Sequence, residues 1–246
     1  MGRIKNNASK RQKDIILKRT AQNEENETVE IAIPATVYFS NSGRMLVNSP
    51  GLGVCKDGEN GKFGEVAAFL QELDVASVIL YQSSLADFAF KKVNMEALLM
   101  DNLRTVLSYA TSNAQVICGS NKPVLFVSGH SAGASTTAAV GPENPQVSKM
   151  LLISPSGDID PSIVKESLSK YAGELYVISG DKDYVISPEA AHALAEWATK
   201  AKIKRIVTVP DCDHDFSGER NGQLFSEAYL WAFKRDGTLH AFLNED

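Results

Sequence analysis

Ser131 lies between two glycines in the run Gly129-His130-Ser131-Ala132-Gly133. The apolar run 123–127 before it predicts a buried strand, and the small residues 132–140 after it are compatible with a helix. A sharp turn between a strand and a helix pushes a serine hydroxyl out at the top of a sheet. Glycine is needed on both sides of such a turn, where a side chain would collide with crowded backbone. The pattern predicts a nucleophilic serine.

Acidic residues and a histidine follow two later apolar runs. Gly180-Asp181-Lys182-Asp183 comes after residues 175–178, and Asp213-His214-Asp215 comes after residues 206–209. In an α/β sheet, ligands bind outside the carboxyl ends of the strands, so we expect these groups to share an edge with Ser131. A serine hydroxyl needs a neighbouring base to take its proton, and an ionised acid can hold that base in the correct tautomer.

His214 is the strongest candidate for the base, because it alone among the four histidines follows a late strand. His192 falls inside a predicted helix and His240 lies near the C-terminus, whereas His130 belongs to the serine turn and is expected to pack or to act indirectly. The acidic run around His214 does not predict a metal site, because consecutive residues point in different directions and no further ligands are evident.

Asp183 is the favoured acid, and Asp158, which follows the apolar run 150–153, is its main rival. Asp181 is instead expected to orient the turn. Asp160 precedes Pro161, which is the pattern of a helix cap. The residue types alone leave the choice between Asp183 and Asp158 open.

The rest of the chain alternates between strand and helix patterns. Predicted strands cover residues 29–39 (interrupted at Pro34), 45–48, 76–81, 123–128, 150–153, 175–178 and 206–209, and predicted helices cover 63–73, 95–110, 132–140, 161–173, 188–199 and 224–233. Such alternation indicates an α/β fold with a doubly wound, mostly parallel sheet and helices on both faces.

The chain from residue 28 to 246 resembles the α/β-hydrolase superfamily. The resemblance rests on the Gly129–Gly133 turn, on Asp183 in its turn and on His214, which occur in the chain order serine, acid, histidine. It implies a single catalytic domain in which Ser131, Asp183 and His214 act together. It also implies that backbone N–H groups of Ala132, Gly51 and Leu52 hold a developing oxyanion. Only about twenty residues separate the strands at 150–153 and 175–178, so a large cap domain is not expected.

The composition of the chain bears on its binding partners and its cellular location. A net charge of −5 over 246 residues argues against nucleic-acid binding. The three cysteines are too scattered for a disulfide framework, and no signal segment or 18-residue apolar run is evident. These features predict a cytoplasmic protein without membrane insertion, metal or other cofactor, and they leave the oligomeric state open.

Residues 1–27 differ from the rest of the chain. Seven basic residues are followed by the acidic, asparagine-rich run 23–27, a pattern typical of a solvated extension or a short surface helix. We therefore expect this segment to lie outside the domain and to be dispensable for catalysis.

The sequence as a whole predicts a serine hydrolase that cleaves small to medium acyl esters through an acyl-enzyme. The same three residues also suit a thioesterase, a peptidase or an acyltransferase. A ligand-binding, receptor-like protein with negligible turnover is the alternative from another class.

Overall fold

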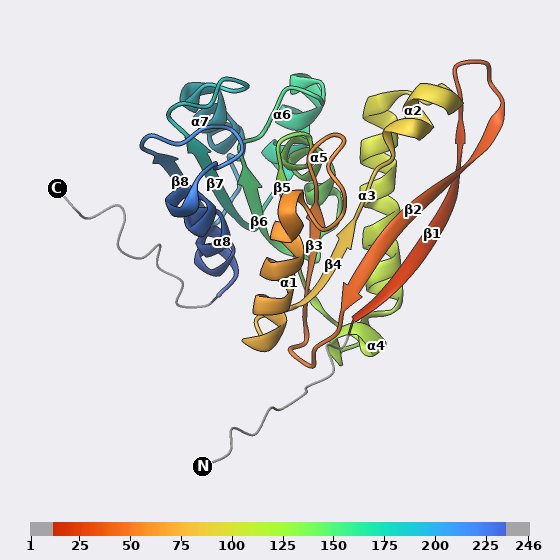
Figure 1. Cartoon of the computed structure of the whole chain (residues 1–246), viewed down its shortest axis with the longest axis horizontal. Coiled ribbons are helices and arrows are strands. Elements are labelled where there is room, and N and C mark those ends of the chain that lie inside the picture. The colour runs from red at the N-terminus through yellow and green to blue at the C-terminus, as the bar shows by residue number, and fades with distance from the viewer. Residues whose placement is uncertain (1–11, 235–246) are drawn as a thin grey trace, which may run out of the picture.

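Along the central strand β3 (Arg44–Ser49), Met45 and Val47 face one side of the sheet and Leu46 faces the other, and all three are fully buried. A strand buried on both faces is typical of a parallel sheet packed between two helical layers. The structure, a computed structural model, describes residues 12–234 and has this layered arrangement (Figure 1).

The sheet contains eight strands in the order β1-β2-β4-β3-β5-β6-β7-β8. The other seven are β1 (Gln12–Gln22), β2 (Thr28–Tyr38), β4 (Ser77–Tyr81), β5 (Val124–His130), β6 (Val147–Ile153), β7 (Glu174–Gly180) and β8 (Ile203–Val209). The β1–β2 and β2–β4 pairs are antiparallel, and every other pair is parallel. The predicted mostly parallel, doubly wound sheet is confirmed.

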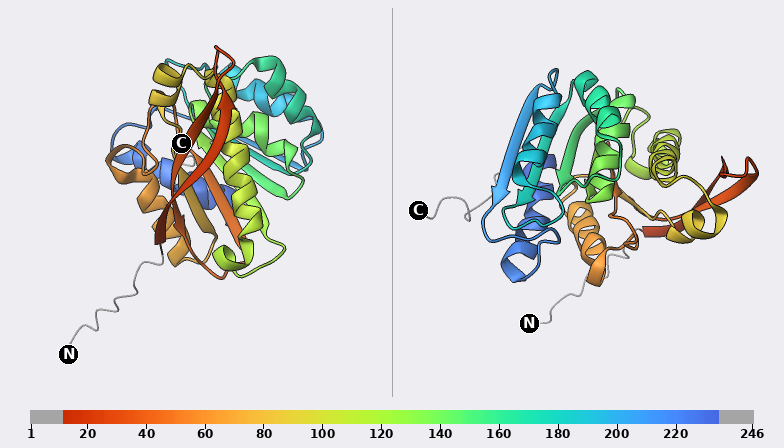
Figure 2. Two further views of the ribbon diagram at one scale, coloured as in Figure 1. Left: turned by 90° about the vertical axis from the view of Figure 1, so that its right-hand side faces the viewer. Right: turned by 90° about the horizontal axis from the view of Figure 1, so that it is seen from above.

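Helices cover both faces of this sheet (Figure 2). The described helices are α1 (Lys62–Glu72), α2 (Leu85–Lys91), α3 (Met95–Ser112), α4 (Ala114–Cys118), α5 (Ala132–Val140), α6 (Pro161–Lys170), α7 (Pro188–Trp197) and α8 (Glu219–Phe233). α1 and α8 pack on one face, whereas α3, α5, α6 and α7 pack on the other. Within residues 12–234, no helix has the length and apolar character needed to cross a membrane.

Local capping signals in the sequence define two of these helices. The Asp160 side chain accepts a hydrogen bond from the Ser162 N–H at the start of α6, and the Ser187 side chain accepts one from the Ala190 N–H at the start of α7. Both caps precede a proline in the first turn, as predicted. Only α6 lies between β6 and β7, so no large cap domain enters there.

The predicted N-terminal extension is wrong for residues 12–22. These residues form β1, an 11-residue strand that pairs with β2 along its whole length and forms one edge of the sheet. Ile15, Leu17 and Ala21 pack against the core, and Arg19 Nε donates a 2.8 Å hydrogen bond to Asn102 Oδ1 on α3. The prediction for residues 1–11 falls outside the described part of the chain.

The acidic, asparagine-rich run is the turn of this hairpin, not part of an arm. Asn23 Oδ1 accepts hydrogen bonds from the N–H groups of Glu25 and Glu27, at 3.0 and 2.8 Å, and Asn26 has φ of 61°. Asparagine favours turns because its side chain bonds nearby backbone and tolerates positive φ. The turn lies beside the end of α2, where the Glu24 N–H donates to the Lys92 carbonyl (Figure 1).

β2 runs without a break through Pro34, where the sequence predicted an interruption. β2 pairs with β1 along its whole length but with β4 only at residues 35–38. Pro34 therefore lies just outside the β2–β4 ladder, where its nitrogen is not required as a hydrogen-bond donor to β4. A proline is tolerated at such a position because no ladder hydrogen bond is lost.

Candidate active site

Ser131 occupies a strained turn between β5 and α5. Its backbone has φ of 55° and ψ of −125°, a conformation that residues other than glycine rarely adopt. The Ser131 N–H donates to the Ile153 carbonyl at 3.0 Å, which ties the turn to the end of β6. Strain of this kind persists only where surrounding structure holds it, and it is concentrated at functional sites.

The two glycines of the turn are required by close backbone contacts. A Cβ atom at Gly129 would lie 2.2 Å from the Gly133 carbonyl oxygen, and one at Gly133 would lie 2.1 Å from the Ser49 carbonyl oxygen. Gly133 therefore allows α5 to approach the loop that follows β3. The sequence-based explanation of these glycines is confirmed.

Ser131, His214 and Asp183 form a continuous hydrogen-bonded series. The distance from His214 Nε2 to Ser131 Oγ is 2.9 Å, and His214 Nδ1 lies 3.0 and 2.9 Å from the two carboxylate oxygens of Asp183. The Asp183 side chain is completely buried and that of His214 is 6% exposed. The structure thus brings together the three residues that the sequence selected from different strand ends.

Asp183 is held by backbone donors as well as by His214. Its Oδ1 atom accepts hydrogen bonds from the N–H groups of Val185 and Ile186, at 2.8 and 3.0 Å. Burial acts to raise the pKa of Asp183, but the bonds from Ile186, His214 and Val185 outweigh it and the pKa is lowered. Asp183 is therefore an ionised carboxylate facing His214 at neutral pH.

The loop that carries His214 packs directly on the turn that carries Asp183. A Cβ atom at Gly180 would lie 1.9 Å from the Cys212 carbonyl oxygen, so only glycine permits this approach. The same carbonyl accepts a 2.9 Å hydrogen bond from the Lys182 N–H, and Asp181 Oδ1 accepts one from the Cys212 N–H at 3.4 Å. Asp181 thus fastens the two segments together, consistent with the turn-orienting role expected for it.

The rival acid has a different environment. Asp158 is exposed and accepts a hydrogen bond from the Ser156 hydroxyl. His214 Nδ1 is directed at Asp183 instead. The geometry therefore favours Asp183 over Asp158 as the partner of His214.

The loop after β3 lies against Ser131 and offers free backbone donors. A Cβ atom at Gly51 would be 3.3 Å from Ser131 Cβ. Within the described residues, the backbone N–H groups of Gly51, Leu52 and Ala132 have no hydrogen-bond partner. Unpaired N–H groups beside a serine are suited to holding a negatively charged oxygen.

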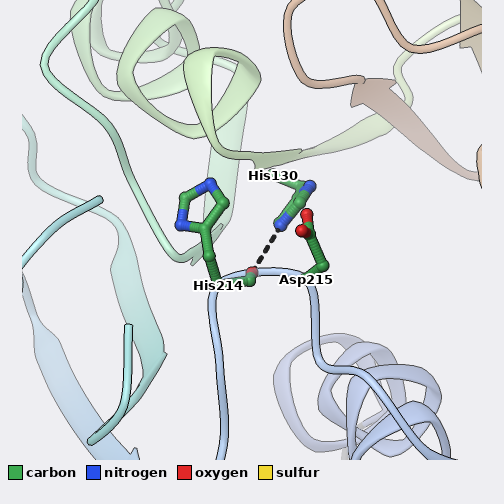
Figure 3. A group of neighbouring side chains, drawn as sticks. All are labelled: His130, His214 and Asp215. Atoms are coloured by element: carbon green, nitrogen blue, oxygen red, sulfur yellow. Dashed lines mark hydrogen bonds between the residues drawn. The ribbon is translucent and has the colours of Figure 1, made fainter. Parts of the chain in front are cut away.

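His130, His214 and Asp215 come close enough for one ligand atom of each to lie within 4.8 Å of the others (Figure 3). Three of the four ring nitrogens of the two histidines have hydrogen-bond partners. His214 Nε2 bonds Ser131 and His214 Nδ1 bonds Asp183. His130 Nε2 lies 3.0 Å from the His214 carbonyl oxygen. These hydrogen bonds account for the close approach of the two histidines.

Apolar side chains near the site divide into buried and exposed groups. Tyr81 is 1% exposed, and its hydroxyl bonds Ser49 Oγ at 2.6 Å, so it belongs to the core. Leu85 and Phe88 on α2 are 43% and 42% exposed, and Leu85 lies over Gly53 in the loop after β3. Leu85 therefore lies beside the loop that contacts Ser131.

Of two further residues beside the triad, Tyr184 had no role assigned from the sequence, and His130 was expected to pack or to act indirectly. The exposed ring of Tyr184 lies 6.1 Å from the His214 ring, measured between centroids. His130 contacts the His214 backbone and packs against Phe225, as expected for a residue with an indirect role. Their positions next to Asp183 and Ser131 in the chain were the only available signal.

No family model matches this chain, and no curated protein matches it. Solved structures do. Est1E from Butyrivibrio proteoclasticus is 15% identical with a TM-score of 0.64, covering 86% of this chain and 95% of its own. Dienelactone hydrolase from Anabaena variabilis is 16% identical with a TM-score of 0.64, covering 91% and 99%. An esterase of Pyrococcus furiosus is 13% identical with a TM-score of 0.63, covering 89% and 93%. The protein therefore has the fold of the α/β-hydrolase superfamily, as its motifs predicted.

Proposed function

We propose that this protein is a serine hydrolase that cleaves carboxylic esters of small to medium acyl groups through an acyl-enzyme. The observation that carries the proposal is the hydrogen-bonded series from Asp183 through His214 to Ser131, with Ser131 at a strained turn. Such a series is what an activated serine nucleophile requires.

In this proposal His214 is the general base. Its Nδ1–H donates to ionised Asp183, so its Nε2 is unprotonated and accepts the hydrogen bond from the Ser131 hydroxyl. As Ser131 Oγ bonds to the ester carbonyl carbon, its proton passes to His214 Nε2. Asp183 stabilises the imidazolium that forms and does not take up the proton.

The carbonyl oxygen becomes an oxyanion in that step, and the free N–H groups of Ala132 and of the Gly51–Leu52 loop would stabilise it. Each such donor contributes about 3–4 kcal/mol to transition-state stabilisation in comparable sites. His214 then returns its proton to the leaving alcohol as the carbon–oxygen bond breaks. In the second half of the cycle, His214 takes a proton from water as the water attacks the acyl-enzyme, and the carboxylic acid product is released. The cycle needs no cofactor.

The ester substrate is supported by the fold neighbours and by the surroundings of the site. Two distinct neighbours, from Rhodothermus marinus and Pyrococcus furiosus, are named as esterases, and Est1E is known with ferulic acid bound. In this chain, exposed Leu85, Phe88 and Tyr184 offer apolar contacts for an acyl or aromatic group. The cytoplasmic location remains a prediction from the sequence.

A fluorophosphonate probe followed by a substrate panel tests the proposal. The wild-type protein should be labelled and should turn over p-nitrophenyl acetate, butyrate and octanoate, with methyl ferulate and matched thioesters and amides as comparisons. Ser131→Ala should lose labelling and turnover while remaining folded. Ser169→Ala is a matched control, because Ser169 lies on α6 and bonds only the Glu166 carbonyl.

Each alternative outcome has a definite meaning. Faster turnover of thioesters or amides than of esters would replace the ester assignment. Tight ligand binding with almost no turnover would indicate a receptor-like protein. Retention of most activity by Ser131→Ala would overturn the assignment of the nucleophile.

A further inference from the structure

His130 is a buried histidine that the proposed chemistry does not use. It precedes Ser131 in the turn, and the residue is only 8% exposed. Its ring packs edge-on against Phe225 of α8, with centroids 5.7 Å apart, and lies 5.3 Å from the His214 ring. Burying an imidazole is costly unless its nitrogens bond a specific partner.

That partner is the backbone of His214. His130 Nε2 lies 3.0 Å from the His214 carbonyl oxygen, the contact drawn as a dashed line in Figure 3. A carbonyl only accepts hydrogen bonds, so Nε2 must carry the proton and donate it. Burial, the largest influence, lowers the pKa of His130 to about 4, so the ring stays neutral at physiological pH.

A second contact holds the same loop at the next residue. Lys62 Nζ on α1 donates to the Asp215 carbonyl at 3.1 Å and lies 3.9 Å above the Phe225 ring. Consecutive carbonyls of the loop are therefore fastened to two different elements. The charged and titratable groups around His130 are His214, Asp215 and Lys62.

We propose that His130 is a positioning residue that holds the backbone of His214 so that its Nε2 stays within hydrogen-bond reach of Ser131. His130 and Ser131 are adjacent in one turn. The same turn therefore fixes the position of the nucleophile and, through the His130 hydrogen bond, the position of the base His214. The inference rests on the proposed hydrolase function for its kinetic consequence, but the geometric role of His130 does not depend on which substrate is cleaved.

The test compares two substitutions at this position with one at another histidine. His130→Met fills similar space without a donor, whereas His130→Gln keeps an N–H near the position of Nε2. His192→Met is the control, because His192 is exposed and bonds Thr208 through the same ring atom. Thermal unfolding, kcat, KM and the pH profile of kcat/KM are measured for each.

We expect kcat of His130→Met to fall about 10- to 100-fold with little change in KM, because small misplacements of a catalytic group cost this much. The pH profile of kcat/KM should also change, because the hydrogen bond that places His214 is lost. His130→Gln should recover most of the loss, and His192→Met should match the wild type. Unchanged kcat and pH profile in His130→Met, or equal losses in the Met and Gln variants, would overturn the proposal.

A spectroscopic measurement separates this inference from the proposed activity. Two-bond ¹H–¹⁵N spectra of the wild-type protein report the tautomer of each histidine whether or not the protein hydrolyses esters. We expect His130 to be neutral and protonated at Nε2 from about pH 5 to 8. Protonation at Nδ1 alone would overturn the inference even if both variants fail to fold, whereas absent ester turnover with the expected tautomer would count against the hydrolase proposal only.

Discussion

Asp183 accepts hydrogen bonds from two backbone N–H groups on one side and from His214 on the other. Asparagine in place of Asp183 keeps the shape of the side chain but removes the negative charge that fixes the imidazole tautomer. We therefore expect Asp183→Asn to lower kcat by about 10³- to 10⁴-fold, as in comparable triads. The measurement is steady-state turnover of a p-nitrophenyl ester, with thermal unfolding to establish that the variant folds.

Asp158→Asn is the matched control for that substitution. Asp158 is exposed and bonds Ser156, so its loss should change turnover by less than about twofold. The reverse ranking of the two variants would assign the acid to Asp158.

The pH dependence of the activity also belongs to individual residues. The pKa of Asp183 is lowered and that of His130 is lowered to about 4, so Asp183 stays ionised and His130 neutral as pH rises from about 5 to 7. Neither group should therefore change the activity in this range, whereas His214 must be neutral to accept the proton of Ser131.

The slope of log kcat/KM against pH should therefore not exceed about one over this range. The profile is measured with a substrate that does not ionise in the range. A slope of two would reveal a second titrating group and contradict this account.

Among the elements, β1 is the one whose contribution to stability is least evident from its sequence. Leu17 is half-buried against the core, whereas Ile16 on the opposite side of the strand is 65% exposed. We expect Leu17→Asp to lower the free energy of unfolding by about 2–3 kcal/mol, because it places a charge in an apolar contact. Urea unfolding measures the effect.

Ile16→Asp introduces the same charge one residue earlier and should change the free energy of unfolding by less than about 0.5 kcal/mol. Equal effects of the two substitutions would show that the side of β1 that carries Leu17 does not stabilise the fold by packing on the core. A chain that begins near Glu27 lacks the whole strand, so we expect it to melt at a lower temperature than the full-length protein, contrary to the sequence-based expectation.

At the scale of the whole molecule, the absence of a large cap between β6 and β7 determines how substrates reach Ser131. Leu85 is partly exposed beside the loop that contacts Ser131. Each added methylene therefore contributes at most about 0.8 kcal/mol, and only until the apolar contacts are filled. We expect kcat/KM for p-nitrophenyl esters to peak at short or medium chains.

Activity on tributyrin should also rise smoothly through its solubility limit, without a jump when droplets form. A preference for long-chain emulsified triglycerides would contradict the prediction. It would mean that another segment covers the site in solution and opens at an interface.

The sequence by itself determined the features that depend on neighbouring residues. The strand, turn and helix around Ser131 were predictable because the glycines and the change from an apolar run to small residues are local. The caps at Asp160 and Ser187 were predictable for the same reason, since each bond joins residues within one turn of helix. The order of strands and helices followed from periodicity and placed His214 at the end of a strand.

The tertiary structure decided what depends on distant parts of the chain. It directed His214 at Asp183 and not Asp158, because side-chain direction at a strand end is set by how loops pack across the sheet edge. It revealed β1, whose alternation is obscured by lysine and arginine and whose pairing only β2 supplies. It also joined His130 to the His214 carbonyl across 84 positions of the chain, a contact that no local pattern can encode.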